Sequence, residues 1–240
     1  MTDRPLAGRT AVVTGASRGI GAAAAHALAA AGARVALAAR SGSAIEALAR
    51  SLGDAHLAVA TDLATPTGVN ALVAAVTPWA GGAPDILVNN AGIFAPTPLD
   101  EQDPEAFAAM LRLNLESPFR LLRAFVAAMR TRGSGHVVTI GSVADRSVRP
   151  GNAAYSASKY GLRALHEALR AEMRGTGVRA SLVSPGPVDT PIWDPVERRL
   201  GRDFPAREAM LAPDDVARAI VFVVSQPPHV DVEELRLSHS

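Results

Sequence analysis

The sequence contains no cysteine among its 240 residues. This absence excludes disulfide bonds, thiolate catalysis and zinc or iron–sulfur centres held by cysteine. No apolar run approaches the roughly 20 residues of a membrane-spanning helix. The first residues also lack the basic and then apolar order of a secretory signal. We therefore expect a cytoplasmic protein that does not associate with a membrane.

An excess of charge of one sign is also missing. The 24 basic and 23 acidic residues leave a formal net charge of +1. Proteins that bind nucleic acid or anionic membranes usually carry a basic excess, so we expect neither partner. Lysine and tyrosine are scarce: Lys159 is the only lysine, and one of the two tyrosines, Tyr155, precedes it by four positions.

What is present is an ordinary globular composition, with 48% hydrophobic and 20% charged residues. The length fits one large domain over residues 1–240, and the chain shows no linker and no internal repeat. The histidines at 26, 56, 136 and 166 have no neighbours at metal-ligand spacing. We expect these histidines to be structural or surface residues, and we predict no metal site.

Short apolar runs, rich in β-branched residues, alternate with longer helical patterns. Continuous runs of this kind are typical of strands that are covered on both faces. They span residues 10–14, 33–39, 55–60, 85–90, 135–142 and 178–184, and the strand-like VEELRL follows near the end. The alternation predicts an α/β, doubly wound Rossmann fold, with a parallel sheet of about seven strands between two helical layers.

The helical patterns cover residues 19–31, 43–52, 66–79, 104–132, 152–174 and 213–225. Ser43 and Glu46 have the spacing of a capping box, and Thr65 followed by Pro66 is a good helix start. Pro118 should kink the longest helix or remove one of its hydrogen bonds. Residues 185–213 are proline-rich with weak periodicity, so they form either a functional loop beside the substrate or an irregular surface loop, with Trp193 exposed.

The first predicted strand leads directly into TGASRGIG, residues 14–21. A sharp turn from a strand into a helix lets the backbone approach a pyrophosphate where the residues have no Cβ atom. The start of the helix then offers free N–H groups to the phosphates. Placed after a strand and before an apolar helix, the turn indicates a dinucleotide site.

The end of the second predicted strand indicates which dinucleotide. An NAD-specific site usually has a carboxylate about 20 positions after the glycines, but here Arg40 follows the strand and no Asp or Glu lies between 33 and 45. A guanidinium can hold a 2′-phosphate with two hydrogen bonds. Arg18, in the glycine turn, could reach the same group. A solvated surface charge is the alternative for each arginine, and together the two favour NADP(H).

These motifs and several others together resemble the short-chain dehydrogenase/reductase family. The matching segments are TGASRGIG at 14–21, Asp62, NNAG at 89–92, Asn114, Ser142, YSASK at 155–159 and PGPVDT at 185–190. They follow the order and spacing of the family over residues 6 to 225. The resemblance implies an oxidoreductase that interconverts small-molecule carbonyl compounds and secondary alcohols.

The resemblance also implies the roles of individual residues. Tyr155 would be the general acid and base, Lys159 would tune Tyr155 and bind the nicotinamide ribose, Ser142 would hold the substrate carbonyl, and Asn114 would position a water. A lysine one helical turn from a tyrosine is expected to lower the tyrosine pKa. The resemblance assigns the cofactor to Gly15, Ser17, Arg18, Gly19, Ile20, Gly21, Arg40, Asp62, Leu63, Asn90, Ala91, Gly92, Tyr155, Lys159, Pro185, Gly186, Val188 and Thr190.

Other interpretations stay open at this point. Asn89 is better explained as structural, and Asp62 could be a simple turn carboxylate. One alternative function is a 3-oxoacyl-carrier-protein reductase, which would need a basic docking patch such as Arg123, Arg130 and Arg132. Another is a catalytically inactive NADP(H)-sensing protein. The family resemblance further implies a homo-oligomer, a tetramer or dimer, built partly on the two longest helices, and Tyr160 is expected to pack inside.

Overall fold

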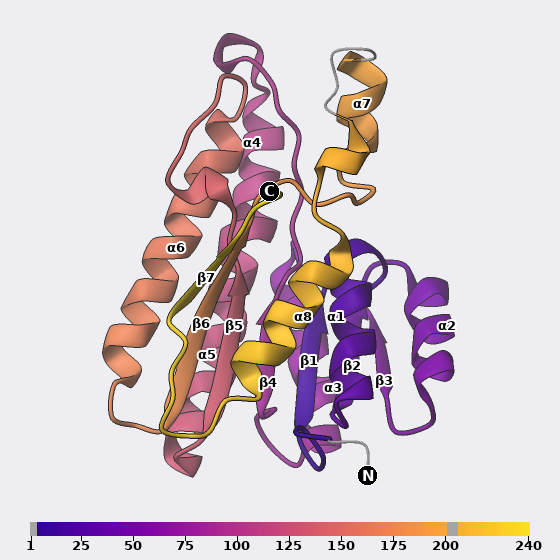
Figure 1. Cartoon of the computed structure of the whole chain (residues 1–240), viewed down its shortest axis with the longest axis vertical. Helices are drawn as coiled ribbons and strands as arrows, with labels where there is room; N and C mark the ends of the chain where they lie inside the picture. Colours follow the sequence, from indigo (N-terminus) through magenta and orange to yellow (C-terminus); the bar gives the residue numbers. More distant parts are fainter. Residues whose placement is uncertain (1–3, 201–205) are drawn as a thin grey trace.

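The protein is described here by a computed structural model that covers residues 4–200 and 206–240. Within these residues, a parallel seven-stranded sheet with the order β3-β2-β1-β4-β5-β6-β7 forms the centre of the molecule (Figure 1). The chain builds one half outward from β1 and then crosses over to β4 to build the other. The strands are β1 (Thr10–Thr14), β2 (Arg34–Ala39), β3 (Leu57–Ala60), β4 (Ile86–Asn89), β5 (Gly135–Ile140), β6 (Val178–Pro185) and β7 (Glu234–Leu237).

The predicted Rossmann fold is confirmed, with each predicted run forming a strand inside or near its expected bounds. All five residues of β1 and all eight of β6 are buried. Burial on both faces explains why these runs lack the alternation of a half-exposed strand. The edge strands β3 and β7 are partly exposed.

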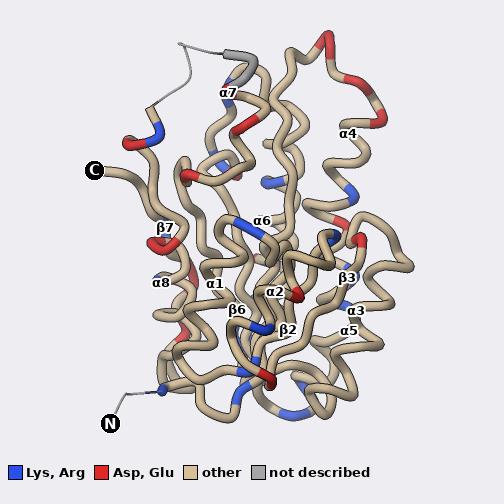
Figure 2. The backbone as a smooth tube through the Cα atoms, turned by 90° about the vertical axis from the view of Figure 1, so that its right-hand side faces the viewer, with Lys and Arg blue, Asp and Glu red and all other residues tan. Residues whose placement is uncertain are grey.

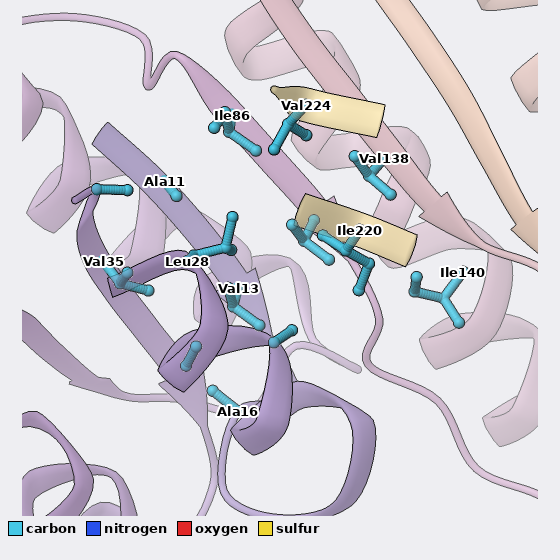
Figure 3. Packing of buried hydrophobic residues seen from close by; sticks show 14 of the residues in the cluster. Ala11, Val13, Ala16, Leu28, Val35, Ile86, Val138, Ile140, Ile220 and Val224 are labelled. Carbon is cyan, nitrogen blue, oxygen red and sulfur yellow. The ribbon is translucent and has the colours of Figure 1, made fainter. Parts of the chain in front are cut away.

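Helices cover both faces of the sheet. One layer contains α1 (Gly19–Ala30), α2 (Gly42–Leu52) and α8 (Pro213–Val224), and the other contains α3 (Pro66–Ala80), α5 (Ser117–Arg132) and α6 (Ala153–Met173). The first layer packs Leu28 of α1 and Ile220 of α8 against Val13 and Val138 of the sheet (Figure 3). At roughly 25 cal/mol per Å² of apolar surface, such side chains stabilise the fold by about 2 kcal/mol each.

The longest predicted helix, 104–132, is interrupted. It consists of α4 (Pro104–Leu111), a π-helical turn η2 (Arg112–Glu116) and α5. Pro118 lies in the first turn of α5 and has no N–H, so it cannot bond the Asn114 carbonyl as residue i+4 would in a regular helix. The predicted loss of one hydrogen bond is therefore explained, although the irregularity begins six residues earlier.

Two local predictions about helix starts have different outcomes. The Thr65 hydroxyl accepts a hydrogen bond from the Gly68 N–H and caps α3, as predicted. The capping box at Ser43 is wrong, because α2 begins at Gly42 after Ser41, and Ser41 makes no side-chain cap. A Cβ atom built on Gly42 would lie only 3.2 Å from the Ala60 Cβ atom. Close packing of Gly42 against β3 therefore sets the start of α2.

The described residues of segment 185–213 form more regular structure than their composition suggests. It contains α7 (Asp194–Leu200) and the short turn η5 (Arg207–Ala209), and residues 201–205 lie outside the described part of the chain. The prediction that Trp193 is exposed is wrong: its indole is partly buried and donates a hydrogen bond to the Val188 carbonyl at 3.0 Å. In Figure 1, α7 stands beyond the carboxyl ends of the strands.

Charged residues of both signs are interspersed along the backbone, consistent with the near-neutral sequence (Figure 2). Among the described helices, none combines the length and the apolar character needed to cross a bilayer.

Candidate active site

A cavity of about 650 Å³ lies at the carboxyl ends of the strands. The carboxyl ends of β1 and β4 meet here, where the strand order reverses, which is where open α/β sheets bind ligands. Except for Gly21 and Asn114, every predicted site residue lines this cavity. Segments that are far apart in the sequence therefore build one site.

The glycine turn forms one wall and is tightly fitted. Gly15 has a φ of 69°, and a Cβ atom there would lie 2.9 Å from the Ala91 Cα. A Cβ on Gly21 would lie 2.2 Å from the Gly15 carbonyl oxygen. Gly21 thus supports the turn from behind instead of lining the cavity. The free N–H groups at the start of α1 point toward the same wall, where an anion is favoured.

A hydrogen-bond network joins β1 to β4 beneath the turn. The Thr14 hydroxyl accepts hydrogen bonds from the backbone N–H groups of Asn90 and Ala91, at 2.9 and 3.0 Å. The Asn90 amide donates to the Thr14 carbonyl at 2.8 Å. Asn90 therefore has the structural role expected of Asn89 in addition to lining the cavity. Asn89 is buried, and its amide has no partner among the described residues.

The far end of this wall is basic. Arg18 and Arg40 are exposed, line the cavity and form no ion pair with any described residue. Asp62 and Leu63 lie beside them, after β3. The Asp62 carboxylate accepts a hydrogen bond from the Ala64 N–H at 3.0 Å, so it shapes its own turn. Two guanidinium groups that form no ion pair with a described residue therefore lie at this end of the cavity together with one carboxylate.

Ser142, Tyr155 and Lys159 meet at the centre of the cavity. Ser142 lies two residues after β5, and its hydroxyl caps the short turn η3 (Val143–Asp145) by accepting from the Ala144 N–H at 3.1 Å. Tyr155 and Lys159 lie in the first turns of α6, and the Lys159 ammonium is 5.7 Å from the centre of the Tyr155 ring. Lys159 is buried and donates to the Ile140 carbonyl at 2.9 Å.

Burial controls the protonation of both groups. It raises the pKa of Tyr155 to about 12, although a hydrogen bond with Ser142 acts in the opposite direction and the Asp145 charge adds to the rise. Burial also lowers the pKa of Lys159 to about 8, partly offset by Asp145. The Tyr155 shift is opposite in direction to the one predicted from the helical spacing, because loss of solvent outweighs the hydrogen bond with Ser142.

Asn114 lies behind the cavity in the π-helical turn, fully buried. Its amide oxygen accepts from the Ile93 N–H at 2.9 Å, while its amide nitrogen donates to the Ile93 carbonyl at 2.9 Å and to the Ser158 hydroxyl at 3.1 Å. The Asn114 side chain therefore ties the segment after β4 to the start of α6. Its backbone carbonyl, opposite Pro118, lacks the usual helical donor.

Asp145 belongs to this site, although the sequence analysis did not single it out. Its carboxylate is buried, accepts from the Ser184 hydroxyl at 3.0 Å and pairs with Arg146 at 2.8 Å and Arg163 at 3.8 Å. Asp145 thus connects the turn after Ser142 with β6 and with α6. Its partner in α6 is Arg163, one helical turn after Lys159. Only the position of Asp145, three residues after Ser142, could have indicated this role.

Aromatic side chains form the opposite wall. The Phe94 ring packs edge-on against Tyr155 at 4.8 Å and against Trp193 at 5.0 Å between centroids. The residues after β6 complete this side: Pro185, Gly186, Val188 and Thr190 all line the cavity. Thr190 also approaches Gly19, whose φ of 55° and lack of a Cβ leave room for the threonine methyl.

Arg207 fixes the segment beyond Thr190. Its guanidinium binds the carboxylates of Asp189 at 2.8 Å, Asp194 at 2.9 Å and Glu197 at 2.5 Å. One guanidinium therefore pairs with three carboxylates near the cavity mouth, and this cluster keeps a net negative charge. No cluster of three or more possible metal ligands occurs among residues 4–200 and 206–240.

Comparison with known proteins gives a consistent result. Residues 9–201 match the family model described as short chain dehydrogenase. An uncharacterized oxidoreductase of Staphylococcus haemolyticus is 36% identical over 231 residues, covering 96% of both chains.

Solved structures agree with this match. A metagenomic short-chain oxidoreductase in complex with NADP has a TM-score of 0.83 and 35% identity, covering 98% of this chain and 100% of its own. A 3-ketoacyl-(acyl-carrier-protein) reductase from Brucella melitensis complexed with NADH has a TM-score of 0.85 and 28% identity, covering 96% and 97%.

Proposed function

The chain belongs to the short chain dehydrogenase family and is an NAD(P)-dependent oxidoreductase, and from this premise we propose that it uses NADP(H) to interconvert a carbonyl compound and a secondary alcohol. The observation that carries this proposal is the meeting of Ser142, Tyr155 and Lys159 in one cavity beside the glycine turn.

The residues of the cavity fit a dinucleotide. Gly15 and Gly19 let the turn lie close to Ala91 and Thr190, because a Cβ on either glycine would crowd these residues, and the turn lies at the start of α1, where phosphates bind. Arg18 and Arg40 would hold the 2′-phosphate, because both are free of carboxylate partners in the described chain. Asp62 and Leu63 would contact the adenine, and Asn90, Ala91, Gly92, Val188 and Thr190 would line the nicotinamide side.

When bound, NADPH supplies the hydride that reduces the carbonyl carbon. Ser142 would donate a hydrogen bond to the carbonyl oxygen, and the Tyr155 hydroxyl would give that oxygen its proton. One hydride and one proton convert the carbonyl to a secondary alcohol and leave NADP⁺. In the reverse direction, Tyr155 accepts the alcohol proton, which requires a phenolate.

Lys159 would favour that phenolate. Its pKa of about 8 keeps most of the side chain charged at neutral pH, within 5.7 Å of the Tyr155 ring. The positive charge of oxidised nicotinamide would act in the same direction and oppose the effect of burial on Tyr155. Lys159 would also bind the nicotinamide ribose. The water predicted at Asn114 would bind its backbone carbonyl, because its amide already bonds Ile93 and Ser158.

Exposed aromatic rings support the proposed homo-oligomer, a tetramer or dimer. Phe107 of α4, Phe119 of α5 and Tyr160 of α6 are 36%, 50% and 43% exposed. The prediction that Tyr160 packs inside its own chain is therefore wrong. A second copy packed on these helices would remove three aromatic rings from water.

The solved Brucella reductase keeps one alternative open, a 3-oxoacyl-carrier-protein reductase. The basic patch suggested for such a partner is weakened, since Arg132 binds the carbonyls of Ala83 and Pro84. Arg123 and Arg130 remain exposed. The other alternative is an inactive NADP(H)-sensing protein, against which the complete set of Ser142, Tyr155 and Lys159 argues.

A carbonyl substrate panel with NADPH, followed by absorbance in both directions, tests the proposal. The Tyr155→Phe variant should lose roughly 10³-fold or more in kcat, the upper range for general acid–base catalysis, while its Kd for NADPH stays within about twofold. Full turnover by this variant would remove Tyr155 from the mechanism. NADPH binding without turnover of any carbonyl by the wild-type protein would favour the sensing function, and activity confined to acyl-carrier-protein substrates would favour the reductase alternative.

A further inference from the structure

Arg149 lines the cavity and has no acidic partner among the described residues. We propose that the carbonyl substrate carries a carboxylate and that Arg149 binds this carboxylate. This inference rests on the proposed function and names the substrate class of the same site.

Arg149 lies in the turn between η3 and α6, six residues before Tyr155, and lines the cavity. Hydrogen bonds hold the turn in place on both sides: the Asn152 N–H donates to the Arg149 carbonyl at 3.1 Å, and the Thr97 N–H donates to the Gly151 carbonyl at 2.8 Å. The backbone of Arg149 is therefore fixed beside the wall that carries Phe94, while its side chain is exposed at the mouth.

The guanidinium of Arg149 has no acidic partner in the described part of the chain. The nearby described acidic groups already have partners. Asp145 is buried against Arg146 and Arg163, while Asp189, Asp194 and Glu197 all bind Arg207. Lys159 is directed to the Ile140 carbonyl and is assigned to the cofactor. Arg149 thus lines this end of the cavity as a cation that no described acidic group pairs.

Each end of the cavity carries at least one arginine that has no acidic partner among the described residues. Arg18 and Arg40 are free cations at the end where a nucleotide phosphate would lie, and Arg149 is a free cation at the end where the substrate would lie. A guanidinium forms two parallel hydrogen bonds with a carboxylate as it does with a phosphate. Arg149 would therefore bind a substrate carboxylate as Arg18 and Arg40 would bind the nucleotide phosphate.

The remaining walls limit the rest of the substrate. Apolar side chains line the cavity at Ile93, Phe94, Val143, Ile192 and Trp193, as do the polar Ser147 and Asn152 near Arg149. The carbonyl would lie at Ser142 and Tyr155, the carboxylate at Arg149, and an apolar linker between them. The substrate class is therefore an oxo-carboxylate, reduced to the corresponding hydroxy-carboxylate.

Matched acids and esters test this inference with the intact protein and NADPH. The substrates are 2-oxohexanoate, 4-oxopentanoate and 5-oxohexanoate, each beside its methyl ester, which keeps the carbonyl and removes the charge. At least one acid should exceed its ester about tenfold in kcat/KM, as expected for a charge-assisted hydrogen bond, and the preference should weaken with added salt.

Arg149→Gln should lose this preference by lowering kcat/KM for the acid about tenfold, with the ester rate and the Kd for NADPH unchanged. Arg149→Lys should retain part of the preference. Arg130→Gln, an exposed arginine of α5 near the opposite edge of the sheet, is the control and should retain all of it. Esters reduced as well as acids by the wild-type enzyme, or equal losses on both in Arg149→Gln, would overturn the inference.

A binding measurement separates this inference from the oxidoreductase assignment. The Kd of 5-hydroxyhexanoate for the protein saturated with NADP⁺ is measured by calorimetry for wild type and Arg149→Gln. Tighter binding to wild type by about tenfold supports the carboxylate site even if no carbonyl is reduced. Equal or undetectable binding in both, with 4-hydroxypentanoate and 2-hydroxyhexanoate giving the same result, contradicts it.

Discussion

The two halves of the cavity are built differently. The half proposed for the cofactor, the cofactor half, is built mainly on backbone, namely the glycine turn and the ends of β1 and β4, which side-chain hydrogen bonds of Thr14 and Asn90 join. Arg18 and Arg40 add charged side chains at its far end. The substrate half consists of side chains from separate loops, with Phe94 after β4, Ser142 and Arg149 around η3, and Trp193 after β6. Backbone geometry tolerates few sequences, whereas loop side chains can be exchanged one at a time.

This difference predicts distinct responses to mutation. Changes in the cofactor half should reduce cofactor binding, through the shape of the turn or through the charge of its arginines. Changes in the substrate half should act on the substrate or on catalysis and leave the cofactor bound. The three experiments below test that separation.

Gly21→Ala should have the largest effect of the three. Its new Cβ would lie 2.2 Å from the Gly15 carbonyl, so the turn must shift. We expect the Kd for NADPH, measured by fluorescence titration, to rise roughly 100-fold, as for an overpacking cost of 1–3 kcal/mol. Gly81→Ala is the control: its φ of 72° makes it strained, but no atom lies within 4 Å of the added carbon. Gly81→Ala should lower only the free energy of unfolding. An equal loss of NADPH binding in this control would contradict the claim that Gly21→Ala acts through the shape of the glycine turn.

Acid should loosen the substrate half more than the cofactor half. Burial lowers the pKa of His136 to about 3 and of His166 to about 4, from the usual 6.5. His166 hydrogen-bonds Thr139 at 3.0 Å and so ties α6 to β5. The folded-state pKa values of His136 and His166 are depressed, so the stabilisation that their neutral forms provide is complete above pH 6.5. This stabilisation is lost as the pH falls toward 4.

We expect the free energy of unfolding to fall by about 2 kcal/mol or more between pH 7 and pH 4.5. Hydrogen exchange, corrected for intrinsic rates, should increase first in α6 and β5, while the Thr14–Asn90 region, which has no titrating group in its network, stays protected. His166→Gln should flatten part of this pH dependence, and the exposed His26→Gln should not. An equal increase of hydrogen exchange in both halves of the cavity would contradict the proposed difference between them.

Arg40→Asp should have the smallest effect and should be confined to the cofactor half. A carboxylate at this position repels a 2′-phosphate, so kcat/KM for NADPH should fall at least about fivefold, equivalent to roughly 1 kcal/mol. The rate with NADH should hold or improve. Arg50→Asp, an exposed arginine of α2 outside the cavity, is the control. A smaller loss with NADPH would mean that Arg40 does not read the 2′-phosphate.

The sequence predicted the cofactor half well because local rules determine it. Apolar runs such as TAVVT and VRASLVS became buried strands, and TGASRGIG became a strand–turn–helix, since each depends on residues close in the chain. Helix starts were less certain: Thr65 caps α3, but packing of Gly42 against Ala60 moved the start of α2.

The substrate half depends on contacts between distant residues. Arg207 binds Asp189 from 18 positions away, Asn114 bonds Ser158 from 44, and Ser184 bonds Asp145 from 39. No periodicity or spacing rule indicates such pairs. The direction of the Tyr155 pKa shift was also beyond the sequence, because it depends on how far burial outweighs the hydrogen bond with Ser142.

Lys159 has a consequence for handling the protein in the laboratory. Apart from the α-amino group, it is the only amine in the sequence, and it is 6% exposed at the base of the cavity. Amine-reactive reagents therefore have one internal target, which lies in the cavity wall beside the space proposed for the cofactor. The extent of Lys159 labelling, followed by mass spectrometry with and without NADP⁺, would report directly on occupancy of that space without a substrate.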